Sequence, residues 1–232
     1  FAAMVVPFLI GFATTGLLAW FYLRFHYAFD EMIVLVDEEN AAISTAPKLA
    51  THDSETPLHR AFSVFLFNEK GELLLQKRAA AKKTWAGIWS NSCCGHLMLH
   101  ETLENAAARR LKFELGLNGV KLLNILPDFR YKAEKDGVVE NEICPVLVGL
   151  LNKNPRLNPA EVAEFEWISW KRFCREIKAK DCAYSPWSIL EADQLLNSPD
   201  FCSWFAENVR SENADHLNES KNNTDRIKAN AA

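Results

Sequence analysis

The pattern of apolar and polar positions in the middle of the chain predicts two strands joined by a turn. Residues 61–67 (AFSVFLF) are almost wholly apolar and rich in Phe and Val, which is typical of a buried strand. Residues 68–71 contain the polar and Gly residues of a turn, and residues 72–77 (ELLLQK) are strand-like again. We therefore expect a hairpin over residues 61–77.

A helical pattern follows this hairpin. Thr102 is a favoured N-cap residue, and Gly116 is the residue type that most often ends a helix. Between them Ala107, Leu111 and Leu115 recur at every fourth position and form one apolar stripe. The sequence therefore predicts an amphipathic helix between Thr102 and Gly116.

Residues 125–133 and 138–150 predict a second strand pair, separated by the turn sequence Lys135-Asp136-Gly137. A short strand is expected over residues 164–169, and helices over residues 170–179 and 186–196. Strands and helices alternate, yet hairpins dominate the order. This order predicts an α/β sandwich with a mixed sheet, in contrast to a doubly wound parallel sheet.

The two ends of the chain differ from this middle part. Residues 1–23 are apolar and uncharged, and a membrane anchor, a remnant of a fused upstream membrane protein and a buried core helix are three interpretations of them. Arg24 and His26 follow, so the positive-inside rule places the folded domain in the cytoplasm. We expect an apolar helix over residues 1–29, one folded domain over 30–205 and a disordered polar tail over 206–232.

Composition narrows the possible partners. A chain of 232 residues that is 49% hydrophobic fits one well-cored domain. With 26 basic and 30 acidic residues there is no net positive charge to attract nucleic acid, so an anionic ligand would need local cations. The six cysteines include no C-x-x-C pair of the zinc-site kind, which favours reduced thiols. The oligomeric state is left open.

One predicted strand carries candidate chemistry. Glu140 and Glu142 are two positions apart in an otherwise apolar segment, so their carboxylates share one face of the sheet. A bound divalent cation, Mg²⁺, Mn²⁺ or Zn²⁺, would explain two buried carboxylates, and His52, His59 and His96 could complete its ligands. The alternatives are ordinary core or surface histidines and a Glu pair on a solvated strand edge.

A second motif lies around the predicted helix. Gly95, Glu101, Arg109, Glu114 and Gly116 have the spacing of the Nudix box, G-x5-E-x7-R-E-U-x-E-E-x-G-U. Two glutamates of that box are replaced here, by Arg110 and Phe113. Those glutamates would carry the metal ions for diphosphate hydrolysis, so their replacement argues against a hydrolase.

Six ordered motifs lie within about residues 31–196: HRAFSVFLF from His59, WSNSCCGH from Trp89, RRLKFELG from Arg109, PDFRYKA from Pro127, VENEICPV from Val139 and YSPW from Tyr184. Together they resemble the metal-dependent (type I) isopentenyl-diphosphate isomerases of the Nudix-like superfamily. The resemblance implies a Nudix-like α/β/α sandwich. It also implies interconversion of isopentenyl and dimethylallyl diphosphate by protonation and deprotonation.

The resemblance implies a role for each matched residue. Cys94 (not Cys93) and Glu142 would be the acid/base pair, assisted by Tyr131. His52, His59, His96, Glu140 and Glu142 would bind one Mn²⁺, Mg²⁺ or Zn²⁺, and Glu114 would hold a Mg²⁺ together with the substrate diphosphate. The substrate itself would be bound by Arg78, Lys82 and Lys48 at the diphosphate and by Trp187 at the hydrocarbon.

The chain departs from the family pattern after His96. Leu97 and His100 stand where the family usually has Pro and Gly. His100 is thus either a surface residue or an added polar contact near the metal. Two other functions are considered beside the isomerase, a Nudix-type diphosphate hydrolase and a non-catalytic binding protein with the same fold.

Overall fold

The computed structural model describes residues 32–179 and 182–209. Within these ranges strands and helices follow one another in this order: β1 (Met32–Val36), β2 (Ala42–Pro47), α2 (Lys48–Thr51), β3 (His59–Phe67), β4 (Glu72–Arg78), β5 (Trp89–Ser90), β6 (Cys93–His96), α3 (Leu103–Leu115), β7 (Leu122–Leu126), β8 (Arg130–Lys135), β9 (Val138–Ile143), β10 (Val146–Leu150), β11 (Val162–Ser169), α4 (Trp170–Glu176), α5 (Pro186–Asn197) and α6 (Pro199–Asn208).

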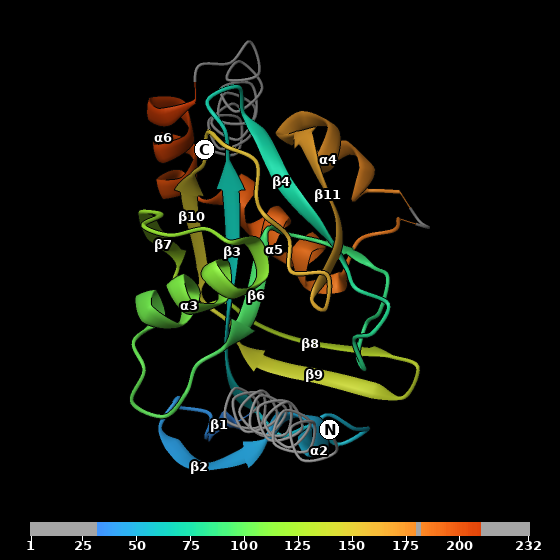
Figure 1. Ribbon diagram of the computed structural model, residues 1–232. Coiled ribbons are helices and arrows are strands. Elements are labelled where there is room, and N and C mark those ends of the chain that lie inside the picture. Colours follow the sequence, from blue (N-terminus) through green and yellow to red (C-terminus); the bar gives the residue numbers. More distant parts are fainter. Residues whose placement is uncertain (1–31, 180–181, 210–232) are drawn as a thin grey trace, which may run out of the picture.

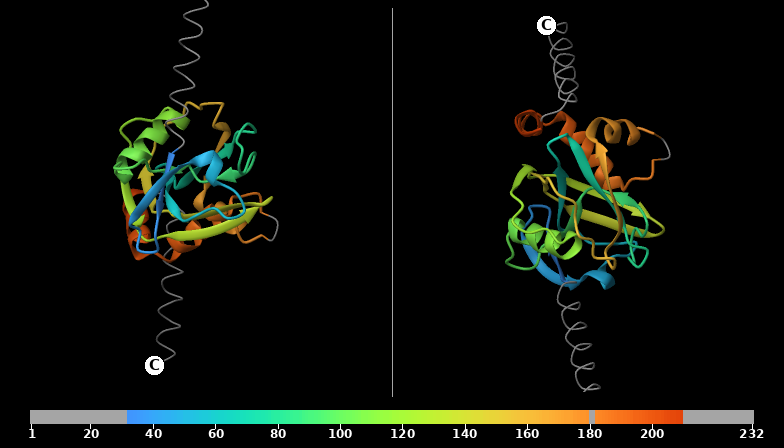
Figure 2. Two further views of the ribbon diagram at one scale, coloured as in Figure 1. Left: turned by 90° about the horizontal axis from the view of Figure 1, so that it is seen from below. Right: turned by 45° about the horizontal axis from the view of Figure 1, so that its top comes forward.

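Strand β3 is central because its two halves pair with different neighbours. At its start, His59 pairs with Leu35 of β1 and with Glu142 of β9. Further along, β3 pairs antiparallel with β6 and parallel with β10. Figures 1 and 2 show the β1–β2 and β8–β9 hairpins at the end where β3 begins, and α4, α5 and α6 toward the other end. The start of β3 is therefore where three distant segments meet.

Side chains of β3 alternate between two helical layers. Phe62, Val64 and Leu66 pack into the core that α3 covers. Phe65 and Phe67 point to the opposite face, into the core that α5 and α6 cover. All five are 0% exposed, and burial of one such side chain contributes about 1.5–3 kcal/mol. The structure is thus a mixed-sheet α/β/α sandwich, which confirms the predicted fold class (Figure 1).

The predicted amphipathic helix is confirmed as α3, including both of its ends. The Thr102 hydroxyl accepts a hydrogen bond from the backbone N–H of Asn105, as an N-cap should. Gly116 ends the helix in the left-handed region, at φ 64°, where a side chain is disfavoured. The predicted stripe, Leu111 included, is buried against β3 and β6.

Two predicted strands are each two strands in the structure. The continuous strand expected over residues 125–133 is wrong, because β7 ends at Leu126 and a turn starting at Pro127 precedes β8. The strand expected over 138–150 likewise breaks between β9 and β10, at Pro145. Proline has no backbone N–H and cannot continue a ladder, which explains both breaks. The hairpin of β3 and β4 is present, although only Phe67 and Leu73 pair.

The ends of the chain were expected to be separate from the folded domain. The expected apolar helix, residues 1–29, lies outside the described residues. Helix α6 continues to Asn208, past the predicted start of the tail at residue 206, and residues 210–232 also lie outside the description. Within the described part of the chain, no helix combines the length and apolar character needed to cross a membrane.

Candidate active site

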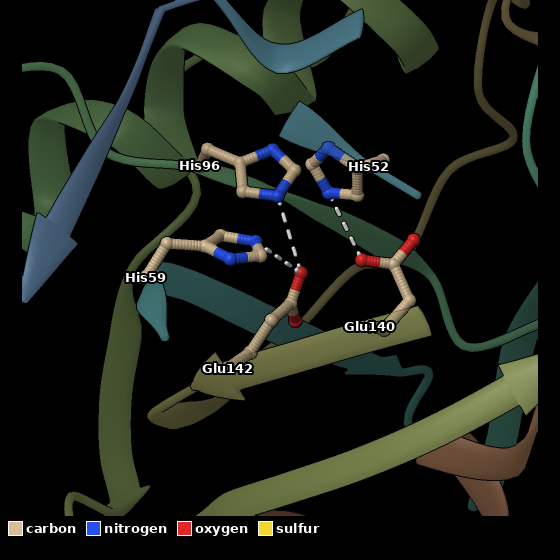
Figure 3. Close-up of side chains that lie close together, drawn as sticks. All are labelled: His52, His59, His96, Glu140 and Glu142. Carbon is tan, nitrogen blue, oxygen red and sulfur yellow. Dashed lines mark hydrogen bonds and ion pairs between the residues drawn. The ribbon is translucent and has the colours of Figure 1, made fainter. Parts of the chain in front are cut away.

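Five side chains from four segments converge where β3 begins. Strand register explains the convergence: His59 on β3 lies opposite Glu142 on β9, and His96 on β6 lies opposite Ala61 on β3. Alternation along β9 puts Glu140 on the same face as Glu142, and His52 comes from the end of α2. One ligand atom from each of the five residues lies within 4.8 Å of all the others (Figure 3).

The histidines are oriented as metal ligands usually are. The Nδ1 atoms of His52 and His59 lie 2.7 Å and 2.9 Å from the backbone carbonyl oxygens of Lys48 and Pro57. Donation from Nδ1 leaves the Nε2 lone pair of each ring free, pointing toward the carboxylates. The buried Nε2 atom of His52 lies 3.0 Å from the buried Oε2 atom of Glu140, so a ring nitrogen and a carboxylate oxygen face each other here too (Figure 3). These atoms fit a divalent cation, because lone pairs facing each other otherwise repel.

The charges in this cluster are strongly coupled. Oε1 of Glu142 lies 3.3 Å from Nε2 of His59 and 3.1 Å from Nε2 of His96. Burial alone would raise the pKa of Glu142, but its close contacts with the Nε2 atoms of both histidines hold it well below its usual range. Burial, together with the charge of Lys48, holds the pKa of His96 well below its ordinary value. A neutral imidazole and an ionised carboxylate are the forms that bind metals.

Cys94 faces the same site from β6. Its Sγ atom donates to Oδ1 of Asn91 at 3.0 Å and lies 3.4 Å from the Ser63 hydroxyl. Burial raises the pKa of Cys94 to about 12, so the group is a protonated thiol at neutral pH. Cys93 points to the other face of the sheet, into the core beneath α3, and is 0% exposed.

Aromatic rings complete the wall around Cys94. Tyr131 on β8 lies directly opposite Glu142 in the strand register. Its ring centroid is 6.1 Å from that of Trp187 at the start of α5, which also meets Trp85 edge-on at 5.3 Å. Cys94, Glu142, Tyr131 and Trp187 line one small cavity of about 40 Å³.

Basic side chains surround the entrance of that cavity. Lys48, Lys82 and Arg110 line both the small cavity and an adjoining outer one of about 370 Å³, and Arg78 lines the small one. Burial and the neighbouring charges of Lys82, Arg110 and Arg78 lower the pKa of Lys48 to about 8. Four cations gathered at one cavity favour a polyanionic ligand.

Comparison with known proteins agrees with this geometry. The NUDIX domain model matches residues 57–187. An isopentenyl-diphosphate Delta-isomerase of Paenarthrobacter aurescens (strain TC1) is 46% identical over 169 residues, 72% of this chain and 92% of that protein. One of Enterobacter sp. (strain 638) is 40% identical over 181 residues, 78% of this chain and 97% of that protein.

The chain belongs to the isopentenyl-diphosphate Delta-isomerase family. Among solved structures, DR0079 from Deinococcus radiodurans has a TM-score of 0.57 at 19% identity and covers 71% of this chain and 98% of its own, which supports the Nudix-like fold. Family membership makes the chain an enzyme of the isomerase type. It therefore favours the isomerase over both the hydrolase and the non-catalytic binding protein.

Two residues of the Nudix box have unexpected partners in this family member. Glu114, expected to hold Mg²⁺, is not one of the five converging residues and lies on the cationic side of the cavity. Its Oε1 atom accepts from Nη2 of Arg110 at 2.5 Å, and its Oε2 atom accepts from the Gln76 amide at 3.2 Å. Arg110 also bonds Glu161, which in turn pairs with Lys82 at 2.5 Å.

Sequence reasoning did not assign Arg110 or Asn91 to the site. A signal existed for Arg110, because a residue four positions before Glu114 on a helix lies on the same face. Asn91 stands inside the quoted WSNSCCGH motif, three positions before Cys94. Of the two interpretations of His100, the structure supports the surface residue: its side chain is exposed, in a turn at φ 65°, and it is not one of the five converging residues.

Proposed function

We propose that Cys94 and Glu142 carry out the proton transfers by which this protein interconverts isopentenyl diphosphate and dimethylallyl diphosphate. One observation carries the proposal. A protonated thiol and a carboxylate from different strands line the same small cavity, directly inside a ring of cations. We assign the activity to the domain of residues 30–205.

The reaction requires one proton donor and one proton acceptor. A proton is added to the terminal carbon of the double bond, which leaves a tertiary carbocation at the other alkene carbon. Another proton is then removed from the next carbon along the chain, so that the double bond moves one position inward. Cys94 is protonated at neutral pH, and Glu142 is ionised, so one group of each kind is present. Tyr131, opposite Glu142, is placed to assist it, and the Trp187 ring faces the cavity, where its π face would stabilise the cation.

The five-donor cluster would hold one divalent ion. Three imidazole nitrogens and two carboxylates suit Mn²⁺, Mg²⁺ or Zn²⁺, and the close approach of these buried nitrogen and oxygen atoms supports such an ion. When bound, the ion supplies positive charge next to Glu142 and so sets the basicity of that carboxylate. His59 and His96 hold Glu142 in place at the edge of the cavity.

The protein would bind the diphosphate without hydrolysing it. Lys48, Arg78 and Lys82 are the cations that sequence reasoning assigned to it, and Arg110 joins them at the entrance. Glu114 would bind a Mg²⁺ that accompanies the diphosphate. Since Arg110 and Phe113 occupy the positions of two metal-binding glutamates of the Nudix box, the site lacks the carboxylates that would support hydrolysis.

The test uses the full chain with isopentenyl diphosphate, Mg²⁺ and Mn²⁺ in heavy water. We expect a five-carbon product that carries deuterium and still carries its diphosphate, measured by mass spectrometry and ³¹P NMR. Release of inorganic phosphate or diphosphate at the turnover rate would instead support the hydrolase. Absence of deuterium from the carbon skeleton of an isomerised product would contradict proton transfer as the mechanism.

A further inference from the structure

A buried carboxyl group beneath the cavity has no part in the chemistry described so far. Glu191 lies on α5 and is 0% exposed. Within the described ranges it forms no ion pair, and its Oε2 atom has no hydrogen-bond partner. An ionised carboxylate in such a place would be strongly destabilised. The neighbours of this carboxyl group are therefore informative.

Those neighbours connect Glu191 to both proposed catalytic strands. The thiol of Cys144, two residues after Glu142, donates to Oε1 of Glu191 at 3.8 Å. The Ser63 hydroxyl lies 3.6 Å from Sγ of Cys144 and 3.4 Å from Sγ of Cys94. Ser63 is therefore shared between the catalytic thiol and the group that contacts Glu191.

Helix geometry adds a third connection. Glu191 follows Trp187 by four positions, so the two side chains lie on the same face of α5, one turn apart. Trp187 lines the cavity, and Glu191 contacts Cys144, which in turn contacts Ser63. Through these contacts Glu191 connects α5, the helix that carries Trp187, to the strands that carry Cys94 and Glu142.

We propose that Glu191 is a positioning residue that, through the thiol of Cys144, orients the Ser63 hydroxyl and with it the Sγ atom of Cys94. The role rests on the proposed function of Cys94. It requires hydrogen bonding by Glu191 and no change in its charge. Burial raises the pKa of Glu191 well above its usual range, with a hydrogen bond from Ser63 opposing and the charge of Glu142 adding to the rise.

Three single variants separate positioning from mere packing. Glu191→Gln keeps the shape and the hydrogen-bonding capacity, whereas Glu191→Leu keeps only the volume. Leu195→Ala, one turn further along α5 and 0% exposed, loosens the same helix at a site that does not line the cavity. Steady-state kinetics of the full chain with isopentenyl diphosphate are measured from pH 6 to pH 9, with thermal unfolding of each variant.

We expect Glu191→Leu to lower kcat about tenfold with KM within about twofold, because a misplaced thiol affects the chemical step more than binding. Glu191→Gln is expected to keep kcat within about twofold and the wild-type pH profile. Leu195→Ala should keep kcat at temperatures where it is folded. Wild-type kcat in Glu191→Leu, or an equal loss in Glu191→Gln, would overturn the proposal.

A double-mutant cycle tests the path through Ser63. If Glu191 acts by way of that hydroxyl, Ser63→Ala with Glu191→Leu should lose no more kcat than the worse single variant. If the loss of kcat in the double variant equals the product of the two single losses, this path is contradicted. Cys94→Ala distinguishes the failure of this inference from that of the proposed function: if Cys94→Ala is active, the function proposal fails, whereas an inactive Cys94→Ala with a normal Glu191→Leu overturns only the role of Glu191.

Discussion

The two sides of the catalytic cavity are built from opposite kinds of charge. On one side, the ring nitrogens of His52, His59 and His96 face the carboxylates of Glu140 and Glu142. On the other side, the cations Lys48, Arg78, Lys82 and Arg110 are accompanied by the carboxylates of Glu114 and Glu161.

The difference shows what each side lacks. The five residues of the His/Glu side include no lysine or arginine, and their imidazole and carboxylate groups are a donor set that could bind a metal ion. The Lys/Arg side has four cations against two carboxylates, and burial together with the neighbouring positive charges lowers the pKa of Lys48. The first side thus has the donor groups for a divalent cation, and the second has the positive charge for a polyanion.

The largest effect is expected on the His/Glu side. Glu142→Gln removes the proposed base and one of the five metal donors, so kcat should fall about 10⁴-fold. Metal content of the purified variant, measured by mass spectrometry, should fall as well. Glu134→Gln, an exposed position on the neighbouring β8, is the control and should keep wild-type kinetics. Substantial turnover by Glu142→Gln would remove this residue from the mechanism.

The vicinal cysteines provide the next test. Cys94→Ala should lower kcat about 10³-fold, because it removes the proposed proton donor from the cavity. Cys93→Ala changes a side chain in the core beneath α3 and should lower the melting temperature more than kcat. Rates of deuterium incorporation measure the chemistry in both. The reverse ranking of the two variants would show that the wrong thiol is assigned.

A smaller effect is expected on the Lys/Arg side. Arg110→Gln removes a charged contact to the diphosphate, so KM should rise about 30-fold while kcat changes less. The same change leaves the buried carboxylate of Glu114 without its cation, which should lower the melting temperature. Lys112→Gln, exposed on α3, is the matched control. An unchanged KM in Arg110→Gln would separate Arg110 from substrate binding.

The smallest effect concerns the pH dependence of Lys48. Its pKa is lowered to about 8, so the ammonium charge is present below that pH and is lost as the pH rises through it. The value of kcat/KM reports on the free enzyme. Above pH 8 it should therefore fall about fivefold further in the wild type than in Lys48→Met. The dependence should be absent from kcat, because bound diphosphate stabilises the charged form. Identical profiles in both proteins would contradict the role of Lys48.

Local chemistry accounts for the parts of the fold that were predicted. Thr102 and Gly116 mark the ends of α3 because capping depends on neighbouring residues alone. The splits at Pro127 and Pro145 were missed although each proline was visible in the sequence. Strand β1 and helix α6 were not predicted; their apolar faces are buried against distant partners.

Sequence by itself determined the list of groups that can do chemistry. Alternation along one strand put Glu140 and Glu142 on a common face, and ordered motifs singled out Cys94 among six thiols. Those inferences need only short-range geometry or resemblance. They say nothing about which other side chains approach from elsewhere in the chain.

Tertiary structure alone decided the distances between these groups and the surroundings of each one. Parallel pairing of β3 with β9 brings His59 next to Glu142, residues far apart in sequence. The same packing gives Glu114 an arginine partner and buries Glu191 near Ser63 without a cation. Burial and charge neighbours depend on every element packed around a side chain, and for that reason only the folded chain could show them.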